Sequence, residues 1–146
     1  MNKIKLLLVM AMVMTMSLTM SADDDDRVIT FEQLPQAAQT FLQQHFASMV
    51  PLVVTADWDD YTIMYESGDR VEFDRGGQWK DIECYASSVP AVLIPEQIKA
   101  YVNKTYPNTT VLKLERRRMG YEVHISNGME IEFNRNFQVI DIDYDD

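Results

Sequence analysis

The chain has 146 residues, of which 23 are acidic and 13 basic, and its formal net charge is −10. Such a charge argues against binding to nucleic acid or to anionic membrane surfaces, and it favours a basic partner. Cys84 is the only cysteine, so the sequence excludes a disulfide within the chain. We expect Cys84 to be a small buried hydrophobic residue, with a reactive or intermolecular thiol as the alternative.

Residues 1–22 have the order of a secretory signal peptide. Lys3 and Lys5 precede an apolar run from Leu6 to Met16, and small residues follow up to Ala22. The apolar run is shorter than the ~20 residues of a membrane span. Cleavage after Ser21 or Ala22 would remove two lysines and no acid, and so would change the net charge from −10 to −12. We therefore expect a periplasmic or secreted protein without membrane insertion after cleavage; a buried first helix is the alternative, against which the four aspartates at 23–26 argue.

The rest of the chain repeats itself. Residues 34–85 align without a gap with residues 94–145, at a constant offset of 60. The repeat predicts two copies, 23–85 and 86–146, that share one compact body. The ten identical pairs are Pro35/Pro95, Leu52/Leu112, Tyr61/Tyr121, Gly68/Gly128, Glu72/Glu132, Phe73/Phe133, Arg75/Arg135, Gln78/Gln138, Asp81/Asp141 and Ile82/Ile142.

Each copy is predicted to open with a helix. Apolar residues recur at helical spacing between Leu34 and Phe46, and again between Ile94 and Tyr106. Pro35 and Pro95 suit a first helical turn, where the missing N–H costs no hydrogen bond. Pro107 and Asn108 end the second helix.

Four short strands with alternating apolar residues follow in each copy. Ser67-Gly68 and Asn127-Gly128 are hairpin turn signals at equivalent positions. The predicted fold is therefore α+β, with tandem α-β-β-β-β repeats that form a continuous antiparallel sheet and place both helices on one face. The inward-facing sets are Leu52/Val54, Tyr61/Ile63/Tyr65, Val71/Phe73 and Ile82/Cys84 in the first copy, and Leu112/Leu114, Tyr121/Val123/Ile125, Ile131/Phe133 and Ile140/Ile142/Tyr144 in the second.

The opposite, open face of the sheet is where the copies differ. Trp79 has the same strand parity as Asp81 and Glu83, so a large aromatic side chain is expected among acids on a face without a helix. Exposed aromatic residues with polar neighbours are typical of interaction sites. Alternatively, a loop or the other copy covers Trp79, or a bulge at Gly76-Gly77 reverses its direction. The candidate partner-binding residues are Trp79, Met64, Arg70, Glu72, Tyr85, His124 and Val139.

No motif indicates an enzyme, a metal site or a cofactor. His45 and His124 are far apart in the sequence and no third ligand is evident, so a zinc site is not expected. The acidic stretch 57–60 lacks the spacing and the glycine of an EF-hand loop, and we expect a solvated turn there. Its counterpart in the second copy is basic, with Arg116, Arg117 and Arg118.

The stretches Leu34–Phe41 and Val71–Ile82 resemble the PepSY-like family of small exported bacterial proteins. The second copy is the divergent one, because Phe137 and Val139 stand where the family has glycine and tryptophan. The family is similar in architecture to the β-lactamase inhibitor protein, in which the joined sheet of a tandem repeat faces a partner. The resemblance implies inhibition or regulation of peptidases, and it supplies no catalytic residue.

These observations predict a non-enzymatic periplasmic binding module. It would bind a protein or peptide of the cell envelope through its open sheet face, and its narrower role would be that of a peptidase regulator or inhibitor. A protein of the cell envelope that binds a cation or a small ligand is the alternative.

Overall fold

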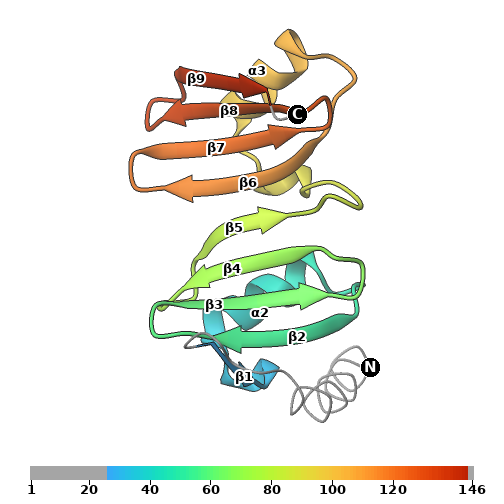
Figure 1. The fold of residues 1–146 in the computed structure, drawn as a ribbon, viewed down its shortest axis with the longest axis vertical. Helices are drawn as coiled ribbons and strands as arrows, with labels where there is room; N and C mark the ends of the chain where they lie inside the picture. Colours follow the sequence, from blue (N-terminus) through green and yellow to red (C-terminus); the bar gives the residue numbers. More distant parts are fainter. Residues whose placement is uncertain (1–25, 145–146) are drawn as a thin grey trace. The chain divides into compact units, whose positions relative to one another are not determined.

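The computed structural model describes residues 26–144, which form nine antiparallel strands and two α-helices, an α+β fold (Figure 1). The predicted signal peptide, residues 1–22, lies outside the described residues. The chain divides into two compact units, unit 1 up to Lys80 and unit 2 from Asp81. The division falls within strand β5, Trp79–Glu83, whereas the sequence repeat places it after Tyr85.

Unit 1 begins with a short strand and a 3-10 turn that the sequence pattern does not predict. Strands β1 to β4 are antiparallel neighbours in chain order, and β5 begins after the next turn. The elements are β1 (Arg27–Ile29), η2 (Phe31–Gln33), α2 (Gln36–His45), β2 (Pro51–Ala56), β3 (Asp60–Tyr65) and β4 (Arg70–Asp74).

Unit 2 contains the counterparts of η2, α2, β2, β3 and β4 at an offset of 60 residues, and its last strand corresponds to β5, whereas residues 87–89, the counterpart of β1, form no strand. Residues 81–83 of β5 pair with β6, and β6 to β9 follow as antiparallel neighbours. The elements are η3 (Ala91–Leu93), α3 (Glu96–Thr105), β6 (Val111–Arg117), β7 (Gly120–Ile125), β8 (Met129–Asn134) and β9 (Val139–Tyr144).

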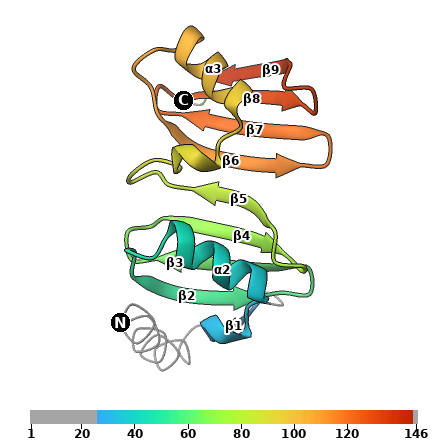
Figure 2. The ribbon, with the colours of Figure 1, turned by 180° about the vertical axis from the view of Figure 1, so that it is seen from behind.

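One helix crosses one face of the strands in each unit (Figure 2). The apolar stripe of α2 buries Ala38 and Leu42, and that of α3 buries Ile98 and Val102. The same aromatic contact joins helix and sheet twice. Phe41 meets Phe73 edge to face with ring centroids 5.7 Å apart, and Tyr101 meets Phe133 in the same way at 5.6 Å. Neither helix is long and apolar enough to cross a membrane, within the residues that the structure describes.

The turn before the last strand of each unit differs. Gly77 has a positive φ of 87°, and a Cβ added there would lie 2.8 Å from Cβ of Pro35, at the start of α2. Phe137 occupies the equivalent place with φ 60° and stacks on Tyr121, with ring centroids 5.6 Å apart. Close approach of the helix therefore requires glycine in unit 1, whereas unit 2 accommodates an aromatic residue.

The expected inward direction of Leu52 is wrong. The register of β2 against β3 shifts between Pro51 and Val53, so Pro51 is buried and Leu52 is 40% exposed. The same shift occurs between Val111 and Lys113, where Val111 is buried and Leu112 is half-buried. A β-bulge changes the alternation of side chains by one residue.

Ile142 lies on the helix-covered face as expected, because it is opposite the buried Ile131, but the burial expected for the apolar residues of β9 is wrong. Ile140, Ile142 and Tyr144 are 59%, 40% and 65% exposed. Ile82, which has the place of Ile142 in β5, is fully buried opposite Leu114 of β6. Among the described strands β9 pairs only with β8, so it lacks the second neighbour that β5 has in β6. Cys84 is buried as expected.

Candidate functional site

Two rows of mostly charged side chains cross the sheet of unit 2 on the face opposite α3, which we call the unit 2 open face. Residues directly opposite each other on neighbouring strands define each row. The first, the acidic row, consists of Asp81, Glu115, Glu122, Glu132 and Asp141, one from each of the strands β5 to β9. The second, the mixed row, consists of Glu83, Lys113, His124, Glu130 and Asp143.

Arg117 neutralises the middle of the acidic row. Its guanidinium lies 3.3 Å from Glu115 and 2.5 Å from Glu122, and it also contacts Glu132. Partial burial alone would lower the pKa of Arg117, but the carboxylates around it outweigh this effect and raise the pKa. Arg117 therefore stays charged and holds three carboxylates side by side.

Lys113 neutralises the carboxylates of β5 in the same way. Its ammonium lies 3.5 Å from Glu83, 3.9 Å from Asp81 and 4.0 Å from Glu115. Burial would lower its pKa, but the negative charges of Asp81, Glu83 and Glu115 raise it overall. The two rows contain eight carboxylates. Their permanent cations are Lys113, within the mixed row, and Arg117, which lies beside the acidic row.

Tyr85 follows β5 beside the mixed row and is 55% exposed. Partial burial raises the pKa of its hydroxyl, and the charge of Glu83 adds to this effect. An exposed aromatic side chain thus adjoins the charged rows.

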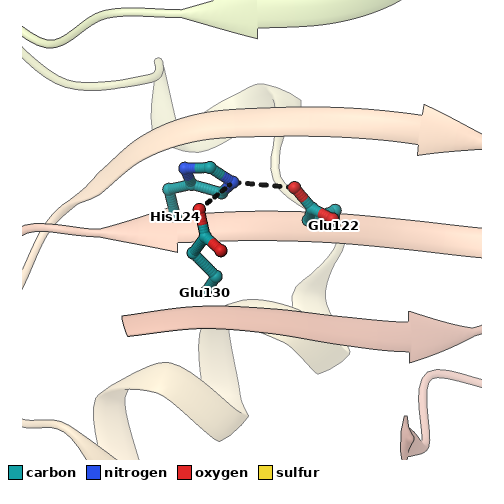
Figure 3. Close-up of side chains that lie close together, drawn as sticks. All are labelled: Glu122, His124 and Glu130. Atoms are coloured by element: carbon teal, nitrogen blue, oxygen red, sulfur yellow. Dashed lines mark hydrogen bonds and ion pairs between the residues drawn. The ribbon is translucent and has the colours of Figure 1, made fainter. Parts of the chain in front are cut away.

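Glu122, His124 and Glu130 converge on the unit 2 open face (Figure 3). Nε2 of His124 lies 2.7 Å from Oε1 of Glu122 and 3.3 Å from Oε1 of Glu130. One ligand atom from each residue lies within 4.8 Å of the others, and all three side chains are half-buried. Of these three residues only His124 was among the predicted partner-binding residues, and no zinc site was expected. The signal was present, because alternate residues of β7 share a face and the Asn127-Gly128 turn brings Glu130 opposite His124.

The positions in unit 1 that are equivalent to this cluster have side chains of different types. Thr62, Met64 and Arg70 stand where unit 2 has Glu122, His124 and Glu130, and the register between the strands is the same. Arg70 lies 3.0 Å from Glu72, and Lys80 lies 2.6 Å from Asp60. Arg70 and Lys80 of unit 1 thus form ion pairs with Glu72 and Asp60, although Asp74 is opposite Asp60 as a like charge.

The predicted position of Trp79 on the open face is wrong. Lys80, its neighbour, reaches Glu72 at 3.5 Å as well as Asp60, so Lys80 is the β5 residue on that face. Alternation then directs Trp79 toward the face that α2 covers, and Trp79 is half-buried. Val139 is opposite Phe133, a buried residue of the helix-covered face, and the register shifts beside this pair. A β-bulge at Ile140 accounts for the direction of Val139, and Lys80 is the equivalent residue of β5; the bulge considered for Trp79 was expected elsewhere, at Gly76-Gly77.

Of the predicted partner-binding residues, Met64, Arg70 and Glu72 lie on the unit 1 open face and are half-buried. His124 lies on the unit 2 open face, and Tyr85 adjoins it. The structure thus distributes the predicted set over two units and two faces. Binding of a partner by any of them stays a prediction.

The acidic and basic loops have local structural roles. Asp57 accepts hydrogen bonds from the backbone N–H groups of Asp59 and Asp60, which lower the pKa of its carboxyl. Arg75 donates a hydrogen bond to the carbonyl of Trp58, and Arg135 donates one to that of Arg118. The shared arginine therefore anchors the loop between the first two hairpin strands of each unit.

The comparisons with known proteins agree with the family suggested by the sequence. The family model described as "Putative beta-lactamase-inhibitor-like, PepSY-like" matches residues 59–141, more than half of the chain. None of the curated proteins matches the chain.

Three solved structures from Bacteroides have the same fold. One from Bacteroides vulgatus, described as a putative periplasmic protein of the DUF2874 family, is 44% identical, with a TM-score of 0.79 over 84% of this chain and 99% of its own. One from Bacteroides thetaiotaomicron, described as a putative calcium-regulated periplasmic protein, is 40% identical, with a TM-score of 0.80 over 82% and 98%. A second B. vulgatus protein, described as periplasmic and of unknown function, is 29% identical, with a TM-score of 0.77 over 81% and 98%.

The chain therefore belongs to the PepSY-like family.

Proposed function

We propose that this chain is a non-enzymatic binding module of the periplasm, and that its unit 2 open face binds a basic segment of a protein or peptide. The acidic row is the observation that carries the proposal. Five carboxylates from five neighbouring strands stand in one line, with Arg117 and Lys113 as the cations among them. A row of arginine or lysine side chains from a partner would complement this line.

Stability alone does not account for the acidic row. Like charges directly opposite each other destabilise a sheet, and unit 2 has such pairs at Glu115/Glu122, Glu122/Glu132 and Glu132/Asp141. Unit 1 builds the same strands with Thr55 opposite Thr62. Charges that the fold does not need are explained if a partner neutralises them.

The location rests on two observations. The similar solved structures are described as periplasmic proteins, and residues 1–22 have the pattern of a signal peptide. A fusion of residues 1–22 to a reporter that is active only outside the cytoplasm tests the export step. Activity supports it, and a reporter that stays inactive contradicts it.

The narrower role that we propose is inhibition or regulation of an envelope peptidase or a β-lactamase. It is supported by the family description and by the recurrence of the elements at an offset of 60, which suits a tandem repeat with the architecture of the β-lactamase inhibitor protein. Assays of purified enzymes with the protein in excess test this role. Unchanged reaction rates would argue against inhibition and would leave only the proposal that the chain binds a basic segment.

Anisotropy measurements with a fluorescent arginine-rich peptide test the main proposal. The wild type should bind at low salt and lose affinity as salt screens the charges. The variant Glu115→Gln/Glu122→Gln/Glu132→Gln should bind more weakly by about tenfold or more. A matched variant of unit 1, Asp60→Asn/Glu72→Gln/Asp74→Asn, also removes three charges and should bind like the wild type. Equal weakening in both variants would mean that net charge, and not this face, determines binding.

A relative described as calcium-regulated favours a second candidate function, the binding of a cation. Calcium takes carboxylate oxygens as ligands, and the acidic row supplies them in number. Calorimetry with calcium tests this alternative, and a flat titration would end it.

A further inference from the structure

Glu122, His124 and Glu130 offer the donor atoms of a metal site. Glu122 and His124 are alternate residues of β7, and Glu130 of β8 is the direct cross-strand partner of His124. Figure 3 shows the two carboxylates directed at the same ring nitrogen. A neutral imidazole and two carboxylates make a set of three ligands with two negative charges, which balance a divalent cation.

The spacing suits a small metal ion. Bonds of about 2.0–2.1 Å in a tetrahedral site put neighbouring ligand atoms about 3.3 Å apart. His124 and Glu130 already have that separation, 3.3 Å, whereas Glu122 is at 2.7 Å and must move outward by a fraction of an ångström. A rotation about the flexible side chain of Glu122 provides this movement.

The ligand types select among cations. Calcium and magnesium prefer oxygen ligands only, whereas imidazole together with carboxylate suits zinc and its neighbours in the first transition row. Three protein ligands leave a fourth position for water or for a side chain of a partner.

A neighbouring residue orients one of the ligands. Arg117 lies 2.5 Å from Oε2 of Glu122, so the Oε1 atom of that carboxylate is the one directed at His124. Such contacts to a ligand's second atom hold it in place for a metal. Lys113, the partner of His124 on β6, directs its ammonium toward Glu83 and Asp81 of β5.

The fold does not require these three side chains. Unit 1 forms the same hairpin with Thr62, Met64 and Arg70, among which none is a carboxylate or an imidazole. The competing explanation is that His124 contacts the two glutamates directly, without a metal.

We propose that Glu122, His124 and Glu130 form a binding site for Zn²⁺ on the unit 2 open face. This inference goes beyond the binding of a basic partner and is tested without one.

Calorimetry with zinc chloride on protein first freed of metal by a chelator provides the test. We expect one ion per chain and an increase in the melting temperature on addition of zinc. His124→Met and Glu122→Thr introduce the residues that unit 1 has at these places, so they are compatible with the hairpin. Both should reduce the affinity for zinc by at least about tenfold, and Arg117→Ala by about 10- to 100-fold.

Glu132→Gln is the matched control, since Glu132 is on the same face and strand as Glu130 and contacts Arg117, not the histidine. It should leave the affinity for zinc within about threefold of the wild type's. Calcium and magnesium at the concentration at which zinc saturates should not displace zinc from these three residues. The absence of heat with zinc, or equal binding by the wild type and His124→Met, would overturn the proposal and leave direct contacts of His124 with the two glutamates as the explanation of the cluster.

Discussion

Unit 1 and unit 2 build the same scaffold and present different open faces. The helix-to-sheet aromatic contact, the strand registers and the arginine that anchors the first hairpin loop occur in both units. On the open face, unit 1 has paired threonines and ion pairs, whereas unit 2 has the acidic row and the cluster around His124. The comparison teaches which open-face residues the fold does not need, because unit 1 forms the same hairpins without the acidic row and without the cluster around His124.

The largest difference in stability is expected between substitutions of Ile82 and Ile142, which are identical residues at equivalent places. Ile82 is fully buried and Ile142 is 40% exposed. Replacement of Ile82 by alanine should lower the free energy of unfolding by about 2–5 kcal/mol, because it leaves a cavity, and Ile142→Ala should cost less than about 1 kcal/mol. Urea denaturation measures both. Equal losses would show that β9 is covered in solution as β5 is.

Gly77 should be the next most sensitive position. A methyl group there would meet Pro35 and force a left-handed backbone on alanine, so Gly77→Ala should cost about 1–3 kcal/mol. Gly76→Ala is the control, since its nearest contact is at 3.4 Å. If the two variants were equally stable, the helix would not approach this turn as closely as the structure shows.

Replacement of Asp81 and replacement of Asp141 should change the free energy of unfolding in opposite directions. Asp81 is buried beside Lys113, so Asp81→Asn should lower the free energy of unfolding by about 1 kcal/mol. Asp141 is exposed and opposite Glu132, so Asp141→Asn should raise it by about 0.2–0.5 kcal/mol by removing a like-charge contact. Thermal denaturation at low salt resolves the sign. A lower stability of both variants would mean that Asp141 and Glu132 do not repel each other measurably.

The smallest effect on stability is expected for substitution of Asp57, in the turn between β2 and β3. Hydrogen bonds from Asp59 and Asp60 lower the pKa of Asp57 below its usual 3.8, so the ionised carboxyl stabilises the folded state above that pH. This stabilisation disappears as the pH falls through the lowered pKa. The difference in urea midpoint between the wild type and Asp57→Ala should therefore shrink from neutral to acidic pH, and a constant difference would contradict the account.

The repeat in the sequence predicted much of this fold. The helices lie where the apolar spacing placed them, and four strands follow each of them. The bulges were not predictable, because the apolar pattern continues through them. Leu52, Trp79 and Val139 were therefore assigned to the wrong face. The exposure of Ile142 arises because β9 pairs only with β8 among the described strands, which no local pattern shows.

The candidate site was only partly predictable. His124 and the acids around it were expected on one face, but the line of five carboxylates depends on the register between β5 and β6, which joins residues from both sequence copies. The cluster with Glu130 follows from the hairpin register and could have been found from the Asn127-Gly128 turn.

The central claim is that the unit 2 open face, and not its unit 1 counterpart, binds a basic partner. Mapping of backbone amide NMR shifts during titration with an arginine-rich peptide tests it directly. We expect the largest shifts on β6, β7 and β8, and we expect them to disappear in the variant that neutralises Glu115, Glu122 and Glu132. Shifts centred on β2, β3 and β4 would contradict it.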